Sequence, residues 1–448
     1  MVLYSNYIVL EHGIFEGFLE LENGKIKGLY EKWQGEYKDY SDKIIFPGFI
    51  DIHVHGWATG SFWFEKTPQS LREMCRTLPF AGVTSYLGTT GADPIEEIKT
   101  CIRAADQVSE EDPEGAQLLG VHLEGPFINP NRVGAQNSDY VQKPDADMLL
   151  RLQERAKGRI RICDVAPETE NAIDFVEKIK DHVASVSIAH TCTDYDTAMQ
   201  AFEHGANHLT HGFNAMPGIH HRKPGPLSAA ADAEADVELI CDNVHIHPSV
   251  VRLAFKLFTD EHIILISDTM RACGLEDGCY DLGGQQVEVK GNLATLASDS
   301  ATIAGSVTNL MNCLRCAVKT MKIPFASAVK AATHNPARSI GVLDDYGDVE
   351  AGKYANLLIL DEDSRIDRAK LSAVVFSDQK QLDILNSITH PNVKKAILES
   401  MEEQKKSGCR LYVLEAALLI QDGYLDICDE MWYVYADVSK RIERLCAY

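Results

Sequence analysis

The sequence predicts an α/β protein whose core is a (β/α)8 barrel of parallel strands. Eight short apolar runs follow one another between residues 49 and 268, helix-like stretches separate most of them, and five runs end in a histidine, glutamate or aspartate. Strands that alternate with helices are typical of a parallel sheet. In a (β/α)8 barrel the reactive groups lie at the carboxyl ends of the strands, where these side chains stand.

The predicted barrel strands lie near residues 49–55, 83–89, 117–123, 161–166, 184–190, 206–211, 237–242 and 262–268. Before them, residues 1–47 contain short strand-like runs, and Asn23-Gly24 is typical of a hairpin turn. After them come a glycine-rich insertion and a turn with a strand at 347–361. We therefore expect a barrel over 48–343, a small β-sandwich from 1–47 and 344–366, and a C-terminal α/β segment over 367–448.

Composition narrows the class of protein. The chain has 448 residues, 45% hydrophobic and 24% charged, which is typical of globular proteins with two or three domains. No apolar run approaches the roughly 20 residues of a membrane span, and no basic and then apolar leader is present. Twelve cysteines scattered along a chain of this length predict reduced thiols, hence a cytoplasmic protein without a membrane partner. The net charge of -23 argues against a nucleic-acid partner.

Candidate metal ligands follow five of the predicted strands: His53 and His55, Glu124, His190, His211 and Asp268. Two histidines spaced by one residue on a strand point to the same face. A single histidine at a strand end is more often a core or hydrogen-bonded group, but this joint pattern indicates a site for a divalent metal. Such an ion lowers the pKa of water to roughly 7, and Asp268 could then act as the base. Histidines that do not stand at matching positions are expected to be surface or core residues: His12, His182, His204, His208, His220 and His221.

Several motifs carry a family resemblance over residues 1–366: Pro47-Gly-Phe-Ile-Asp-Ile-His-Val-His-Gly, Leu119-Gly-Val-His-Leu-Glu-Gly-Pro-Phe, His211-Gly-Phe-Asn-Ala-Met-Pro, Asp242-Asn-Val-His, Ser267-Asp-Thr and Asn335-Pro-Ala-Arg. They resemble the amidohydrolase superfamily and, within it, the N-acetylglucosamine-6-phosphate deacetylases. The resemblance implies a TIM-like metal-dependent hydrolase barrel. It implies that a small-molecule sugar phosphate, N-acetylglucosamine 6-phosphate, is hydrolysed to glucosamine 6-phosphate and acetate, in amino-sugar catabolism and cell-wall recycling. It also implies a homodimer.

The resemblance assigns roles to individual residues. Glu124, His190 and His211 hold the main ion, His53 and His55 can hold a second, and zinc or iron is expected, with one or two ions per subunit. Asp268 is the catalytic acid and base, and His245 lies near the developing oxyanion. The implied substrate contacts are Ala135, Gln136, Asn214, Ala215, Arg222, His245, Ile303, Ala304 and Gly305. Gln136 stands where the family has a histidine, and the guanidinium of Arg222 matches phosphate oxygens.

The end of the chain carries a second resemblance. Runs such as Leu385-Asn-Ser-Ile-Thr-His-Pro and Cys428-Asp-Glu-Met-Trp-Tyr-Val-Tyr resemble the middle of dephospho-coenzyme A kinase. That family holds phosphates with a G-x-x-x-x-G-K-[ST] loop, and this sequence has none. We therefore expect residues 367–448 to be a partial kinase-like segment without kinase activity.

Two other functions compete with deacetylation. Another amidohydrolase activity, such as that of a cyclic-amide hydrolase or a deaminase, is one alternative. Many cyclic-amide hydrolases bridge two metals with a carboxylated lysine, and no lysine ends the strand at 161–166. A catalytically inactive fusion is the other, and the complete set of ligands argues against it.

Overall fold

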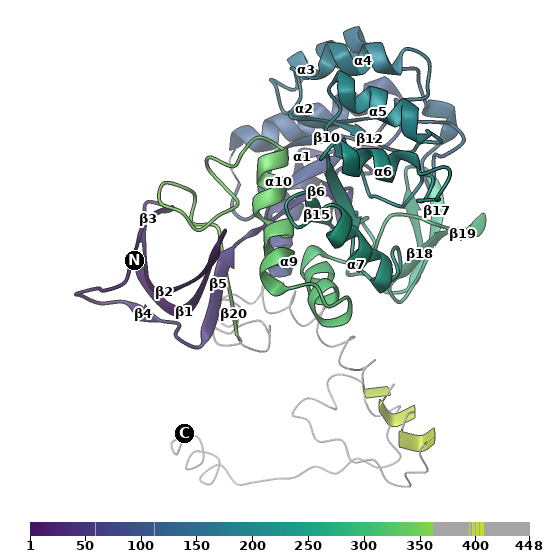
Figure 1. Cartoon of the computed structure of the whole chain (residues 1–448). Helices are drawn as coiled ribbons and strands as arrows, with labels where there is room; N and C mark the ends of the chain where they lie inside the picture. Colours follow the sequence, from purple (N-terminus) through teal and green to yellow (C-terminus); the bar gives the residue numbers. More distant parts are fainter. Residues whose placement is uncertain are drawn as a thin grey trace. The chain divides into compact units, whose positions relative to one another are not determined.

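The computed structural model describes residues 1–58, 60–111 and 113–361, with residues 394, 397, 398, 400–402 and 404–406 (Figure 1). The chain divides into two compact units, Met1–Ile366 and Asp367–Tyr448. The described residues of the second unit are helical. The rest of the kinase-like segment predicted over 367–448 lies outside the described residues.

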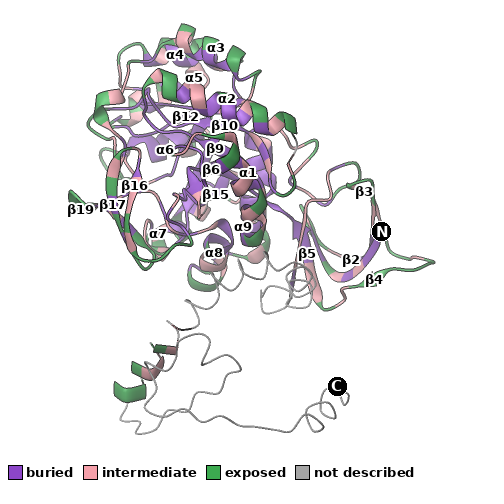
Figure 2. Ribbon diagram, turned by 180° about the vertical axis from the view of Figure 1, so that it is seen from behind, coloured by how far each residue is buried: buried purple, intermediate pink, exposed green. Residues whose placement is uncertain are grey.

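The first unit contains the predicted barrel. Its parallel strands form one eight-stranded sheet in sequence order: β6 (Phe49–Val54), β9 (Val83–Thr89), β10 (Gln117–Leu123), β11 (Ile160–Val165), β12 (Ser185–Ile188), β13 (His208–Leu209), β14 (Asp236–Ile240) and β15 (Ile263–Ile266). Each overlaps a run predicted from the sequence and extends at most one residue beyond it. Most of their residues are buried, as expected for strands covered on both faces (Figure 2).

Helices connect the strands and cover the outside of the sheet (Figure 1). They are α1 (Pro68–Thr77), α2 (Ile95–Glu111), α3 (Ala146–Arg155), α4 (Ala172–Ile179), α5 (Tyr195–His204), α6 (Gly225–Asp232), α7 (Pro248–Leu257), α8 (Leu310–Arg315), α9 (Phe325–Ala332) and α10 (His334–Ser339), with short turns η1 (Leu78–Ala81), η2 (Ser138–Tyr140) and η3 (Cys316–Thr320). Helix α5 shows how the local sequence defines where a helix begins and which of its faces is buried. Asp194 caps its first turn by accepting from the Thr197 N–H, and Ala198, Ala201 and Phe202 face the core.

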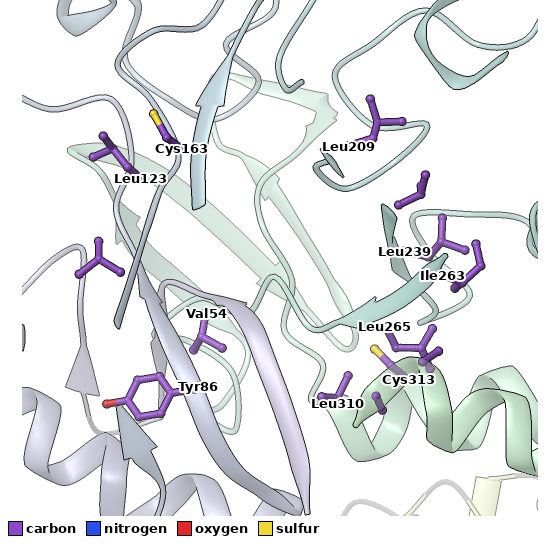
Figure 3. Close-up of a cluster of buried hydrophobic side chains, with 14 of the residues drawn as sticks. Val54, Tyr86, Leu123, Cys163, Leu209, Leu239, Ile263, Leu265, Leu310 and Cys313 are labelled. Carbon is purple, nitrogen blue, oxygen red and sulfur yellow. The ribbon is translucent and has the colours of Figure 1, made fainter. Parts of the chain in front are cut away.

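Two apolar clusters hold the barrel together. The larger one lies between strands and helices and includes Val54, Tyr86, Leu123 and Leu265 (Figure 3). The smaller one joins isoleucines of several strands, such as Ile52 and Ile264, to Ala337 of α10 and to Ile340, which follows that helix. Helix α10 therefore packs against side chains of the barrel strands.

A small sheet domain precedes and follows the barrel. It contains β1 (Val2–Leu10), β2 (Gly13–Glu22), β3 (Lys25–Tyr30), β4 (Lys38–Asp39), β5 (Lys43–Pro47) and β20 (Leu357–Asp361). The antiparallel pairing of β20 with β5 joins the N-terminal and post-barrel segments, as predicted. The expected sandwich takes the form of a single sheet, in the order β20-β5-β1-β2-β3 with β4 beside β1.

The glycine-rich insertion after the barrel strands is also a sheet. Four antiparallel strands form it: β16 (Gly278–Leu282), β17 (Gln285–Lys290), β18 (Leu293–Leu296) and β19 (Asp299–Ile303). A two-stranded ribbon, β7 (Gly56–Trp57) and β8 (Gly60–Ser61), follows the first barrel strand. No helix in the described part of the chain has the length and apolar character of a membrane span.

The first and last barrel strands meet just beyond their carboxyl ends. An isolated parallel bridge joins Val54 to Thr269. The Asp268 N–H donates to the His53 carbonyl at 3.0 Å, and the His55 N–H donates to the Thr269 carbonyl at 3.0 Å. The hydrogen bonds that bring the barrel ends together therefore also bring three of the predicted functional residues together.

Candidate metal centre

The six predicted ligands lie together at the carboxyl ends of the strands. None is more than 8% exposed. His190, His211 and Asp268 follow their strands by two residues and have positive φ angles of 42°, 32° and 49°. Non-glycine residues rarely adopt this backbone conformation, and strain of this kind clusters at functional sites.

Glu124 is the centre of the cluster. Its Oε1 lies 3.0 Å from His190 Nε2 and 3.0 Å from His211 Nε2. Its Oε2 lies 3.2 Å from His55 Nε2, and His53 Nε2 is 3.7 Å from Oε1. Asp268 Oδ1 adds a second carboxylate, 3.3 Å from His55 Nε2 and 3.5 Å from His53 Nε2. All four imidazoles thus turn the same ring nitrogen toward carboxylate oxygens.

Acceptors behind three of the rings determine which nitrogen carries the proton. His190 Nδ1 lies 2.7 Å from the Arg132 carbonyl, and His55 Nδ1 lies 3.2 Å from the Thr89 carbonyl. His53 Nδ1 lies 3.0 Å from Glu238 Oε2. Since these oxygens accept, each Nδ1 donates, and the neutral ring keeps its Nε2 lone pair for the cluster.

The residues fit a divalent ion. Two of the sets of side chains whose ligand atoms lie within 4.8 Å of one another share Glu124: Glu124 with His190 and His211, and Glu124 with His53 and His55. His190 Nε2 and His211 Nε2 approach to 3.1 Å. Two nitrogen lone pairs and a carboxylate at this spacing are the donor set of a zinc-type site, and Glu124 belongs to both sets.

Burial and charge act in opposite directions on these groups. Burial raises the pKa of Glu124, but His53, His190 and His211 outweigh it and hold that pKa well below its usual range. Burial lowers the pKa of His55, but Asp268 and Glu124 outweigh it and raise that pKa to about 9. A metal ion that binds near neutral pH must therefore displace protons from the cluster.

A cavity of about 530 Å³ opens onto the cluster. Seven of the predicted substrate contacts line it: Ala135, Gln136, Asn214, Ala215, His245, Ile303 and Gly305. Ala304 is fully buried and lies outside the lining. Arg222 is exposed, lies outside the lining too, and its guanidinium is 2.7 Å from His221 Nε2. The described chain thus brings all but two of the predicted contacts to one cavity.

Two of the lining side chains are held in a defined orientation. Gln136 Oε1 accepts the Ala92 N–H at 2.6 Å, so its amide NH₂ faces His190, with the two Nε2 atoms 3.3 Å apart. Asp242 accepts from His245 Nδ1 at 2.8 Å. Burial lowers the pKa of His245, but the Asp242 carboxylate outweighs it and raises that pKa, which favours a cationic ring beside the cavity.

Three residues that the structure places here were not predicted from the sequence. Glu238 is fully buried and lies 3.2 Å from His208 Nε2, while it also accepts from His53 and from the His211 N–H. Trp63 and Arg132 both line the cavity. Arg132 is the one lysine or arginine among the residues that line it. The signal for Glu238 was a charged residue inside the apolar strand 237–242. His208 itself is a core histidine, as expected.

Comparisons with known proteins agree with this geometry. A family model described as "Amidohydrolase family" matches residues 44–402. The chain belongs to the amidohydrolase family. Its relatives include the N-acetylglucosamine-6-phosphate deacetylase of Bacillus subtilis (strain 168), 36% identical over 330 residues, which are 73% of this chain and 83% of the relative. The N-acetylgalactosamine-6-phosphate deacetylase of Escherichia coli O157:H7 is 32% identical over 320 residues, covering 71% of this chain and 84% of that protein.

Solved structures of other amidohydrolases share the fold. A mutant N-acetyl-D-glucosamine-6-phosphate deacetylase from Mycobacterium smegmatis, in complex with N-acetyl-D-glucosamine-6-phosphate, aligns with a TM-score of 0.74 at 28% identity, covering 81% of this chain and 95% of that one. The Thermotoga maritima N-acetylglucosamine-6-phosphate deacetylase aligns with a TM-score of 0.70 at 30% identity, covering 81% and 96%. The similarity spans nearly the whole length of the two solved structures and about four-fifths of this chain.

Replacement of Glu238 tests the support behind the ligands. In Glu238→Gln an amide faces His53 Nδ1, His208 and the His211 N–H. Because an amide has only one oxygen that can accept, either the His53 ring or the His208 ring loses its acceptor. Loss of such supporting groups typically weakens metal binding by roughly 10–100-fold. We expect a loss of this size in metal competition with a chelator, while exposed Glu261→Gln binds metal normally. Unchanged affinity in Glu238→Gln would show that Glu238 does not orient this amidohydrolase's ligands.

The protonation of His55 predicts a pH dependence. Because its pKa is raised to about 9, the free ring is protonated below that pH, and only the neutral ring binds an ion. Metal affinity should fall as the pH falls, by up to about tenfold per pH unit for each proton displaced. Calorimetric titration with zinc at pH 6, 7 and 8 measures both affinity and proton release. An affinity that stays constant over this range would contradict the assignment of His55 as a ligand.

Proposed function

We propose that this amidohydrolase hydrolyses N-acetylglucosamine 6-phosphate to glucosamine 6-phosphate and acetate. The observation that carries the proposal is the Glu124-centred cluster, with its cavity lined by Asn214, Ala215 and His245. Relatives whose names carry this activity align over about four-fifths of their length. The galactosamine-named relative makes N-acetylgalactosamine 6-phosphate the second candidate substrate.

We propose zinc or iron as the metal, with one or two ions per subunit. Glu124, His190 and His211 would hold the first, and His53 and His55 with Glu124 the second. When bound, such an ion acts as a Lewis acid toward the amide carbonyl and lowers the pKa of water to roughly 7. The four rings and Glu124 are buried, and a low-dielectric site of this kind strengthens charge interactions with the reacting amide.

Asp268 is the proposed proton carrier. Burial raises its pKa, but His53 and His55 outweigh it and lower that pKa, so the carboxylate is ionised and can accept a proton from the attacking water. It then donates that proton to the amine nitrogen that leaves. His245, fixed by Asp242, is the proposed donor to the oxygen that gains negative charge. The Gln136 amide, which faces His190, is a further proposed donor in the cavity lining.

Asp268→Asn separates chemistry from metal binding. Asparagine keeps the shape of the side chain but cannot take the proton, and loss of a positioned acid or base usually costs about 10²–10⁴-fold in rate. We expect kcat to fall by that range while bound metal stays close to normal. Asp174→Asn, on the exposed surface of α4, is the matched control. A near-normal kcat in Asp268→Asn would exclude this role.

The substrate phosphate needs a cation, and two arginines are candidates. The resemblance assigns Arg222, which lies outside the cavity lining, whereas Arg132 lines it. Arg222→Ala and Arg132→Ala should each be tested with N-acetylglucosamine with and without the 6-phosphate. The variant that removes the phosphate contact raises KM for the phosphorylated sugar and leaves the plain sugar nearly unaffected.

Arg72→Ala is the control, because Arg72 pairs with Glu111 between α1 and α2. If both variants affected the two sugars equally, neither arginine would read the phosphate. That result would point to other polar side chains of the lining, such as Gln136, Asn214 and His245.

Acetate release tests the proposed function as a whole. The full chain should be reconstituted with zinc or iron(II), analysed for metal, and assayed on four substrates: N-acetylglucosamine 6-phosphate, N-acetylgalactosamine 6-phosphate, N-acetylglucosamine and dihydroorotate. We expect the first to be preferred and dihydroorotate to be inert. Turnover of dihydroorotate alone would favour a cyclic-amide hydrolase. No turnover of any substrate by a metal-loaded sample would favour an inactive fusion.

We further propose a cytoplasmic homodimer and no kinase activity. The resemblance to deacetylases supports the dimer, and the lack of a phosphate-binding glycine loop supports the absence of kinase activity. Light scattering on the full chain and on a form ending near residue 368 measures the dimer and the contribution of residues 367–448. Phosphorylation of dephospho-coenzyme A by the full chain would contradict the second proposal.

A further inference from the structure

The cavity has two unlike walls. Polar lining residues adjoin His190 and His211: the Arg132 carbonyl accepts from His190 Nδ1, and the Asn214 amide donates to the His211 carbonyl at 3.2 Å. The wall beside His55 is apolar. The Trp63 ring lies 5.0 Å from the His55 ring between centroids, and Leu282 belongs to the same apolar cluster as Trp63.

Trp63 is held rigidly in this wall. It is 3% exposed, and its indole N–H donates to Asp93 Oδ2 at 3.1 Å. Lys66 Nζ pairs with the same carboxylate oxygen at 2.9 Å. The hydrogen bond and the ion pair together fix one edge of the indole.

Two glycines pack against the six-membered ring of the indole. A Cβ added to Gly91 would lie 2.0 Å from its Cζ2, and one added to Gly283 would lie 2.4 Å from the same atom. Gly91 follows strand β9, and Gly283 is in the turn between β16 and β17. The indole therefore cannot shift unless the barrel loop or the inserted sheet shifts with it, and a close-packed wall of this kind does not yield to a larger group.

We propose that Trp63, with Leu282, forms the pocket for the acyl group and restricts this enzyme to acetyl. The inference rests on the proposed deacetylation. The reacting carbonyl must lie at the Glu124 cluster, so the two groups attached to the amide extend away from it in different directions. The sugar hydroxyls match the polar wall at His190 and His211, which leaves the acyl methyl for the wall at Trp63.

The magnitudes agree with a selective role. Burial of the acetyl methyl group against an apolar wall is favourable because it removes apolar surface from water. One extra methylene against an immobile indole introduces overpacking, and hydrophobic pockets discriminate a single methylene by roughly 10–200-fold. The acetyl group therefore gains apolar contact with the pocket, whereas the longer propionyl and butyryl groups overpack against the Trp63 indole.

The test is the acyl preference of metal-loaded full-length variants. Trp63→Phe replaces the indole by a smaller ring and so enlarges the pocket. Leu282→Ala also enlarges the pocket, and it is the second test if Trp63→Phe folds poorly. kcat/KM is measured for the N-acetyl, N-propionyl and N-butyryl forms of glucosamine 6-phosphate, with a melting temperature for each variant. Trp57→Phe is the matched control, because Trp57 lies in the neighbouring ribbon outside the cavity lining.

We expect the propionyl-to-acetyl ratio to rise about tenfold or more in Trp63→Phe or Leu282→Ala and to stay unchanged in Trp57→Phe. A ratio that stays within about twofold in both cavity variants, with a lower melting temperature, would overturn the inference and leave Trp63 a packing residue. In that case acetate release by the unchanged chain would keep the proposed function intact. No acetate release by the unchanged metal-loaded chain would overturn both.

Discussion

The buried carboxylate of Glu124 is the interaction on which the rest of the site depends. The Nε2 atoms of four histidines lie 3.0 to 3.7 Å from one or the other of its oxygens. An unpaired carboxylate at 3% exposure is strongly unfavourable, and the surrounding rings give its oxygens partners. The carboxylate and the rings therefore stabilise each other, and Glu124 belongs both to the set with His53 and His55 and to the set with His190 and His211.

The barrel makes this arrangement possible through its closure and its interior. The hydrogen bonds between residues 53–55 and 268–269 place one histidine pair and Asp268 at the same point. Polar contacts continue inward from the cluster: Glu238 supports His53, His208 lies against Glu238, and Ser339 of α10 contacts His208 Nδ1 at 3.0 Å. Helix α10 is thus connected to His53, a candidate metal ligand, through buried side chains, each of which limits the freedom of the next.

The strands and the cluster of candidate ligands were predictable because both depend on local pattern. Apolar runs of strand length locate the barrel, and a histidine or acid at the end of a run locates the site, since all strand ends meet at one mouth. Residues such as Glu238 and Trp63 were missed because their roles depend on partners that are distant in the chain: residues 53 and 211 for Glu238, and Gly283 for Trp63. The insertion at 278–303 was seen only as glycine-rich, since short strands with exposed faces have a weak apolar signal.

The family resemblance implied substrate contacts that local sequence pattern does not show, and the structure places only some of these residues in the cavity lining. Asn214 and His245 line the cavity, whereas Arg222 and Ala304 do not. Metal analysis of Glu124→Gln, beside the unchanged chain and exposed Glu96→Gln, tests the central claim most directly. After loading with zinc and removal of free metal, Glu124→Gln should retain almost none, with an unchanged circular dichroism spectrum. A full complement of metal in folded Glu124→Gln would contradict the account.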